Sequence, residues 1–236
     1  MRDTEYHIYP CGDHAITVEL GSEINTAINQ KVLSLFRYLQ AKQIAGVKDI
    51  IPSYHTLTLV YDIATLRKKD PRKTAYENIR EELISALSNQ TGAIENDSKL
   101  VKIPVCYDPS LAPDIVSLAA SHNISVDEVI QLHTDVQYHV YLIGFLPGFA
   151  YMGSVDEKIA TSRRSQPRTS VPAGSVGIAG RQTGIYPFDS PGGWQLIGRT
   201  PLLMFDAPKP EPSLLSAGDT VQFCAISINE FKRLSS

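Results

Sequence analysis

The first ninety residues switch between the two-residue apolar period of strands and the longer period of helices. Four short runs predict strands, and the second and fourth of them alternate: Tyr6–Tyr9, Ala15–Leu20, Val47–Pro52 and Thr56–Tyr61. Between the two pairs, apolar residues recur every three or four positions and predict a helix ending near Gly46: Ile24, Ile28, Val32, Leu35, Phe36 and Leu39. A second helix is expected from Asp70-Pro71, with the aspartate as N-cap, after a solvated loop at Arg67–Lys69. The order ββαββα predicts a small antiparallel sheet with its helices on one side.

The segment 91–99 is polar, small and without periodicity, which is typical of an interdomain linker. Beyond it we expect strands at Leu100–Val105, Val136–Ile143 and Thr220–Ile228. Two helices are expected in this part, one opening at Pro113 and one after the capping box of Ser125 and Glu128. We therefore predict an α+β protein with a small domain at 1–90, a linker at 91–99 and a β-rich second domain at 100–236.

Glycine and proline concentrate between residues 144 and 201, where ten of the 15 glycines, six of the 15 prolines and the one tryptophan fall. Glycine allows close approach of a second backbone or a ligand, and proline marks turns and strand edges. Short apolar runs such as Val176–Ala179 alternate with these turn residues, as expected for a tightly turned barrel or sandwich. Composition alone leaves two interpretations open: a β domain whose turns need glycine, or a scaffold built around a site.

Composition narrows the class of protein. The chain has 236 residues, 43% of them apolar and 20% charged, with a net charge of −3. Basic residues are spread over both halves, which argues against a nucleic-acid-binding face. Three distant cysteines without metal-ligand spacing favour reduced thiols, and we find no signal peptide and no apolar run of bilayer length. A cytoplasmic location is the expectation.

Several catalytic motifs are absent from the sequence. It holds no phosphate-binding Walker loop, no dinucleotide fingerprint and no Gly-x-Ser-x-Gly elbow, and its six histidines lack zinc spacing. We therefore expect no metal in this chain and no complete catalytic apparatus.

Sparse polar side chains in the glycine-rich stretch are the candidates for chemistry: Arg168, Ser175, Gln182, Thr183, Tyr186, Gln195 and Arg199. Three arginines against one carboxylate between Gln166 and Met204 favour an anionic or amide-bearing ligand. We expect Arg168, Gln182, Tyr186, Gln195 and Arg199 to line one concave face, with His139 and Tyr141 near its rim. The alternative is that each side chain only bonds to a turn carbonyl.

An apolar and aromatic segment, 145–152, is interrupted by proline and glycine and is expected to be a loop rather than a core strand. Exposed, it would form a patch for a protein partner. The candidate contact residues are Phe145, Leu146, Phe149, Tyr151 and Met152. The alternative is that these rings close the end of the barrel.

Three sequence blocks carry a family resemblance: GFLPGFAYMG, PRTSVPAGSVGIAG and QTGIYPFDSPGGWQLIGRTP. With the opening PCGDHAITVELG, they resemble the carboxyltransferase-domain subdomain C/D family, formerly called allophanate hydrolase subunit 1. That family contains the B subunit of 5-oxoprolinase and the KipI inhibitor of bacilli, and the likeness covers nearly the whole chain. Arg181 departs from the pattern, which has a small or neutral residue there. The resemblance implies that the second domain is a cyclophilin-like β-barrel.

The resemblance also implies a function. With the A and C subunits of 5-oxoprolinase, such a chain opens 5-oxo-L-proline to L-glutamate while ATP is hydrolysed to ADP and phosphate; which of the three binds ATP stays open. Related proteins bind a sporulation sensor histidine kinase and block its autophosphorylation, with two inhibitors expected per kinase dimer. The alternative is a dedicated, non-enzymatic kinase inhibitor that uses the barrel as a binding module.

Overall fold

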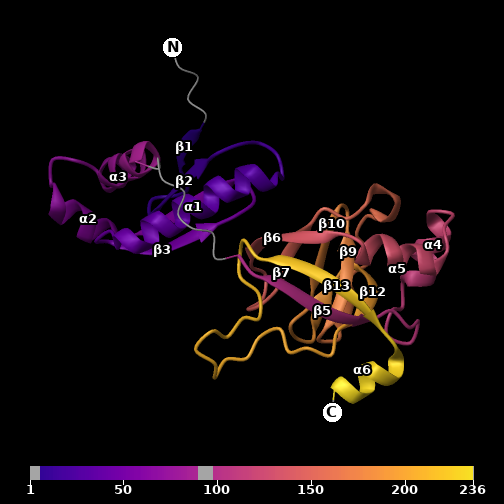
Figure 1. Cartoon of the computed structure of the whole chain (residues 1–236). Coiled ribbons are helices and arrows are strands. Elements are labelled where there is room, and N and C mark those ends of the chain that lie inside the picture. The colour runs from indigo at the N-terminus through magenta and orange to yellow at the C-terminus, as the bar shows by residue number, and fades with distance from the viewer. Residues whose placement is uncertain (1–5, 90–97, 236) are drawn as a thin grey trace. The chain divides into compact units, whose positions relative to one another are not determined.

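The computed structural model describes residues 6–89 and 98–235, and the chain divides into two compact units, Met1–Asp97 and Ser98–Ser236 (Figure 1). Each unit has its own buried apolar core. Most of the expected linker, residues 90–97, lies outside the described residues.

The first unit is built on a four-stranded sheet in the order β1-β2-β4-β3. Its strands are β1 (His7–Pro10), β2 (Ala15–Glu19), β3 (Val47–Pro52) and β4 (Thr56–Tyr61), and all neighbours are antiparallel. The predicted strands and their antiparallel pairing are confirmed, with β3 and β4 at the predicted bounds. The β1 and β3 strands form the two edges of this sheet.

Three helices accompany the sheet: α1 (Thr26–Lys42), α2 (Ile63–Lys69) and α3 (Ala75–Asn89). Alternate residues of β4 are buried, and Leu57 and Leu59 share one core with Leu35 of α1 and Leu83 of α3. The helices therefore cover the sheet face that presents these leucines, as the alternation of β4 predicts.

The prediction that Asp70 caps a single second helix is wrong, because two helices follow β4. Asp62 caps α2, whose last turn contains Arg67–Lys69, so these residues are helical rather than a loop. The Asp70 carboxylate instead accepts from the N–H of Arg72, two residues on, in a local turn. The α3 helix opens with a capping box in which Thr74 Oγ1 accepts from the Glu77 N–H and Glu77 accepts from the Thr74 N–H.

The second unit is a closed barrel of seven strands in the cyclic order β10-β7-β6-β13-β5-β12-β9, which confirms the predicted α+β class and the barrel (Figure 1). The strands are β5 (Leu100–Cys106), β6 (Gln137–Ile143), β7 (Ala150–Gly153), β9 (Ser175–Ala179), β10 (Gln182–Ile185), β12 (Gln195–Arg199) and β13 (Thr220–Ile226). The β5 and β13 strands run parallel, and the other barrel pairs are antiparallel. A separate ribbon pairs β8 (Arg168–Val171) with β11 (Ser190–Gly192).

Helices α4 (Ile115–Ser121) and α5 (Val126–Thr134) contribute apolar side chains to the barrel core, and a short 3-10 turn, η1, spans Glu157–Ile159. The capping box at Ser125 is confirmed, since its side chain accepts from the Glu128 N–H. Pro113 lies one residue before the N-cap, Asp114, so it does not open α4. The last strand ends at Ile226 and is followed by an unpredicted helix, α6 (Ile228–Leu234), whose capping signal is Ser227 followed by Glu230.

Within the described ranges 6–89 and 98–235, the helices are all too short or too polar to span a bilayer. In the same ranges, His, Cys, Asp and Glu side chains do not gather into a group of three or more that would hold a metal ion.

Candidate functional site

Two glycines create a flat strip on the outer face of the barrel. Gly177 of β9 lies opposite Gly184 of β10, and the neighbouring residues Val176, Ile178 and Ile185 belong to the barrel core. Both glycines therefore face outward. A Cβ on Gly184 would lie 3.0 Å from the indole of Trp194 and 3.1 Å from the ring of Phe149. Glycine is required here because the aromatic rings lie directly on the backbone.

An aromatic cluster covers this strip and forms a second, external core. The ring centroid of Phe149 lies 4.8 Å from Tyr151, 5.3 Å from Tyr186 and 5.5 Å from Trp194. Apolar side chains from β8, β9 and β12 complete the cluster: Val171, Ala179 and Leu196. Trp194 and Tyr186 are almost fully buried, so the sheet holds their rings in fixed positions.

A buried carboxylate places two arginines beside the aromatic cluster. Asp114 Oδ1 accepts from Arg164 Nη1 at 3.0 Å and from Arg168 Nη2 at 2.6 Å, and Oδ2 accepts from the N–H of Leu196 at 2.7 Å. The Asp114 side chain is only 4% exposed. One carboxylate serves two guanidinium groups, so this part of the surface keeps a net positive charge. Neither Asp114 nor Arg164 was among the predicted site residues.

The segment that carries Arg164 is attached to the start of β12. The N–H of Arg164 donates to the Gly193 carbonyl at 2.8 Å, and Gln195 Nε2 donates to the Ser162 carbonyl at 3.0 Å. Between these two attachments, the guanidinium carbon of Arg163 lies 5.9 Å from the ring centroid of Trp194, within cation–π range. Gln195 therefore takes part in the site by holding the backbone that presents Arg163.

The two phenols of the cluster are neutral hydroxyl groups at physiological pH. Burial raises the pKa of Tyr186, and this outweighs the opposing effects of the Trp194 backbone and of the charges of Arg163 and Arg168. Burial likewise raises the pKa of Tyr151, against the charge of Arg163. The site thus combines protonated phenols with guanidinium groups, a set of donors that favours an oxyanion.

His139, Tyr141 and Gln182 form a row next to the cluster. His139 of β6 lies opposite Gly153 of β7, which lies opposite Gln182 of β10. The rings of His139 and Tyr141 meet edge to face, with centroids 4.9 Å apart. Burial lowers the pKa of His139 and favours its neutral form. Gln182 stands two residues from Gly184 and so shares its outer face.

Arg199 lies apart from the other predicted site residues. It ends β12, four residues from Gln195, which corresponds to about 13 Å along a strand. Its Nε donates to the Ala173 carbonyl at 2.8 Å, and it lines a groove of about 240 Å³ together with Thr200 and Phe231. The structure therefore brings Arg168, Tyr186 and Gln195 together but not Arg199.

The expectation of one exposed apolar loop at 145–152 is wrong in part. Residues from Ala150 onward form β7, and Met152 faces the barrel core with no exposed surface. Phe149 is buried under the aromatic cluster, and Leu146 and Tyr151 pack at its margin. Phe145, in contrast, is 62% exposed and adopts a positive φ of 69°. Along β7, alternate side chains point to the barrel core and to its outer face, so Met152 is buried in the core and Tyr151 packs against the external cluster. Pro147 and Gly148 come just before this strand and made its alternation hard to see in the sequence.

Two other predicted positions have structural roles. Thr183 faces inward, where its hydroxyl lies 3.0 Å from Nε2 of the fully buried His133. The other ring nitrogen of His133 lies 2.7 Å from the Tyr107 hydroxyl, and burial lowers the pKa of this histidine to about 3. Arg181, where the family pattern has a small residue, is exposed and pairs with Glu157 at 2.9 Å.

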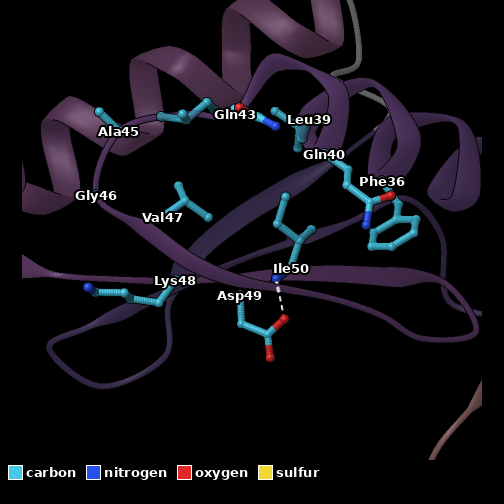
Figure 2. A pocket seen from close by; sticks show the side chains of 11 residues that line it. Phe36, Leu39, Gln40, Gln43, Ala45, Gly46, Val47, Lys48, Asp49 and Ile50 are labelled. Atoms are coloured by element: carbon cyan, nitrogen blue, oxygen red, sulfur yellow. Dashed lines mark hydrogen bonds between the residues drawn. The ribbon is translucent and has the colours of Figure 1, made fainter. Parts of the chain in front are cut away.

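The first unit contains a pocket of about 500 Å³ between the end of α1 and the edge strand β3 (Figure 2). Val47 and Ile50 point from β3 toward α1, whose side of the pocket carries the amides of Gln40 and Gln43 (Figure 2). The Asp49 carboxylate is engaged by the Ile50 N–H at 2.8 Å. This pocket mixes apolar and polar groups, including Lys48 and Asp49, whereas the arginines and the aromatic cluster gather on the barrel.

Comparison with known proteins agrees with this architecture. The family described as carboxyltransferase domain, subdomain C and D, matches residues 6–215. The chain is 40% identical to the B subunit of 5-oxoprolinase from Bacillus subtilis (strain 168), over 96% of this chain and 95% of that protein. It is 38% identical to the B subunit of 5-oxoprolinase from Escherichia coli O157:H7, over 91% of this chain and 94% of that protein. The crystal structure of TTHA0988 superposes with a TM-score of 0.77 and 32% identity over 90% of this chain, but the match spans only 40% of the TTHA0988 chain.

Proposed function

This chain belongs to the carboxyltransferase domain, subdomain C and D, family, and from that premise we propose that it is the B subunit of an ATP-dependent 5-oxoprolinase. The observation that carries the proposal is the 40% identity to the Bacillus subtilis protein across nearly the full length of both chains. The reaction opens the lactam of 5-oxo-L-proline to L-glutamate while ATP is hydrolysed to ADP and phosphate.

The chain acts in this proposal only together with the A and C subunits. Two observations support it. The sequence carries no phosphate loop. In TTHA0988, moreover, the matched region is 40% of a longer chain, so that protein joins this architecture to further sequence in one polypeptide.

The arginine and aromatic groups on the barrel are the contribution we propose for this chain. The substrate carries a carboxylate, and ATP carries phosphate oxygens, so both are anions that guanidinium groups bind through paired donors. ATP supplies the activation of the lactam carbonyl, and phosphoryl transfer depends mainly on positioning and charge neutralisation. Arg168 is held by Asp114 at one nitrogen, and its Nη1 is buried without a hydrogen-bond partner among the described residues. Arg168 and Tyr186 are therefore proposed to orient the anion, with His139, Tyr141 and Gln182 beside them.

Reconstitution tests the proposal. The purified chain, mixed with the A and C subunits, 5-oxoproline and ATP, should release glutamate, and leaving out this chain should abolish the release. Arg168→Gln should lower kcat/KM about ten- to a hundredfold, the usual effect of losing a hydrogen bond to a charged group. Arg181→Gln, which removes an exposed arginine on the same barrel, is the matched control. Equal activity from the A and C subunits alone would refute the assignment.

A second role, inhibition of a sensor histidine kinase, is favoured by one observation. Phe145 is 62% exposed, and its ring is held edge to face at 5.6 Å from Phe149. An exposed aromatic ring held by a buried one is suited to the centre of a protein interface. We propose that Phe145 contacts the kinase, with two inhibitors on each kinase dimer.

Kinase autophosphorylation measures this second role. Phe145→Ser in the full chain should weaken inhibition at least tenfold and leave glutamate release by the reconstituted complex unchanged. Leu203→Ser is the matched control, because Leu203 is 60% exposed in another loop of the same unit. Equal inhibition by both variants would exclude Phe145 as a contact.

A further inference from the structure

Arg163 is a charged group on the barrel that neither the sequence motifs nor the ion pairs of the site account for. Arg164 and Arg168 both pair with Asp114, and Arg181 pairs with Glu157. For Arg163, in contrast, the described part of the chain offers no carboxylate within ion-pair distance. Its guanidinium group stands 5.9 Å above the centre of the Trp194 ring.

Hydrogen bonds on both sides of residue 163 fix the position of its backbone. Its backbone is attached on both sides, through the Ser162 carbonyl to Gln195 and through the Arg164 N–H to the Gly193 carbonyl. The next side chain, Arg164, is tied to Asp114. The backbone that presents Arg163 is therefore fixed, which lowers the conformational entropy lost when this exposed side chain binds a ligand.

The groups around Arg163 are hydrogen-bond donors rather than acceptors. The rings of Tyr151 and Tyr186 lie against Trp194, with centroids 5.9 Å and 6.5 Å from it, and the guanidinium carbon of Arg163 lies 5.9 Å from the same indole. The Tyr186 phenol stays protonated, because burial raises its pKa, so its O–H is able to donate. The one nearby carboxylate, Asp114, already receives three hydrogen bonds. A ligand that pairs with Arg163 at this position must therefore supply a negatively charged hydrogen-bond acceptor.

We propose that Arg163 binds an oxyanion of the substrate above the Trp194 ring, with the hydroxyls of Tyr151 and Tyr186 as further donors. This inference rests on the proposed 5-oxoprolinase function. The oxyanion is either the carboxylate of 5-oxoproline or a phosphate oxygen derived from ATP, since both accept paired hydrogen bonds from a guanidinium group. Arg163 then contacts substrate directly, whereas Asp114 and Gln195 are positioning residues.

Steady-state kinetics of the reconstituted complex distinguish the two sources. If the carboxylate is bound, Arg163→Gln raises KM for 5-oxoproline about ten- to a hundredfold and leaves KM for ATP unchanged. If a phosphate oxygen is bound, KM for ATP rises instead. Arg163→Lys should recover part of the loss, because it keeps the charge but not the planar fork. Arg181→Gln should match the wild type. Unchanged KM for both substrates in Arg163→Gln would overturn the inference.

Fluorescence of the full chain tests the same site without turnover. Trp194 is the only tryptophan in the sequence, so indole emission reports this position alone. Titration with 5-oxoproline, or separately with ATP and inorganic phosphate, should give a saturable change in the wild type and in Arg181→Gln. In Arg163→Gln, the concentration needed for half of that change should be about ten- to a hundredfold higher.

The two readouts separate this inference from the proposed function. A complex that releases no glutamate, with an emission change that still depends on Arg163, would refute the 5-oxoprolinase assignment and keep the oxyanion site. Normal glutamate release by Arg163→Gln, with wild-type KM values and wild-type titrations, would keep the assignment and remove Arg163 from the site. Matching circular dichroism of the variants excludes unfolding as the cause of either result.

Discussion

Asp114 holds three distant parts of the barrel unit together: the start of α4, the 162–168 segment and β12. Removing one partner of a buried ion pair leaves its arginines without compensation. Because Arg164 and Arg168 are partly exposed, we expect Asp114→Ala to cost about 2–3 kcal/mol of unfolding free energy, less than a fully buried pair would lose. Urea denaturation of the variant and the wild type measures this loss of unfolding free energy. Glu157→Ala, which removes an exposed partner of Arg181, should change stability by less than about 1 kcal/mol. An equally small change in Asp114→Ala would contradict its structural role.

His133 makes stability depend on pH in a defined direction. Burial holds its pKa at about 3 in the folded chain, whereas the unfolded chain binds a proton below about pH 6.5. The unfolding free energy should therefore stay level above about pH 6.5 and fall toward pH 3 by up to about 1.4 kcal/mol per pH unit. His139, whose pKa is also lowered by burial, adds to this trend.

His133→Gln should make this pH profile shallower between pH 6.5 and 5, because glutamine does not titrate. Unfolding by urea at pH 7.5, 6 and 5 measures the slope, with the exposed His7→Gln as control. A slope in His133→Gln as steep as that of the wild type would show that other groups cause the loss of stability.

At the scale of the element, the sequence and the structure place different residues at the start of α3: the sequence predicted Asp70 as the cap, whereas Thr74 and Glu77 cap the helix. Thr74 and Glu77 exchange two capping hydrogen bonds, at 3.1 Å and 2.8 Å. Thr74→Ala should therefore cost about 1 kcal/mol, the typical effect of losing an N-cap. Asp70→Ala should cost less, because Asp70 serves a turn rather than a helix. Thermal or urea unfolding of the two variants measures both losses of unfolding free energy. A larger loss in Asp70→Ala than in Thr74→Ala would support Asp70 as the cap that the sequence predicted.

At the scale of the whole molecule, the two units should fold separately, because each has its own apolar core. Limited proteolysis should cut within the polar segment 91–99 and give fragments of about 90 and 140 residues. The fragment 98–236 should keep the Trp194 emission of the full chain and inhibit the kinase as strongly. One protease-resistant core covering the full length would refute independent folding, and inhibition confined to the first fragment would refute the proposed kinase contact.

The sequence by itself determined the elements whose signals are local. The alternation of Thr56–Tyr61 and the capping box at Ser125 placed a strand and a helix start correctly, because a period of two and a cap depend only on near neighbours. The concentration of glycine in residues 144–201 pointed to the barrel and to the region that carries Tyr186 and Arg168. Local patterns failed at Asp70 and Pro113, where another capping residue lies nearby and the pattern does not show which of them the helix uses.

Only the tertiary structure decided which residues share a site. Asp114 bonds to Arg168, 54 positions along the chain, and Gly177 meets Gly184 only because β9 and β10 pair in one register. Arg199 appeared equivalent to Arg168 in the sequence, yet the direction of β12 carries it to the far end of the strand. Periodicity reports which face of an element is buried, whereas barrel closure decides which faces of different strands adjoin. The placement of Arg163 over Trp194 follows from the hydrogen bonds that attach Ser162 to Gln195 and Arg164 to Gly193, residues far apart in the sequence.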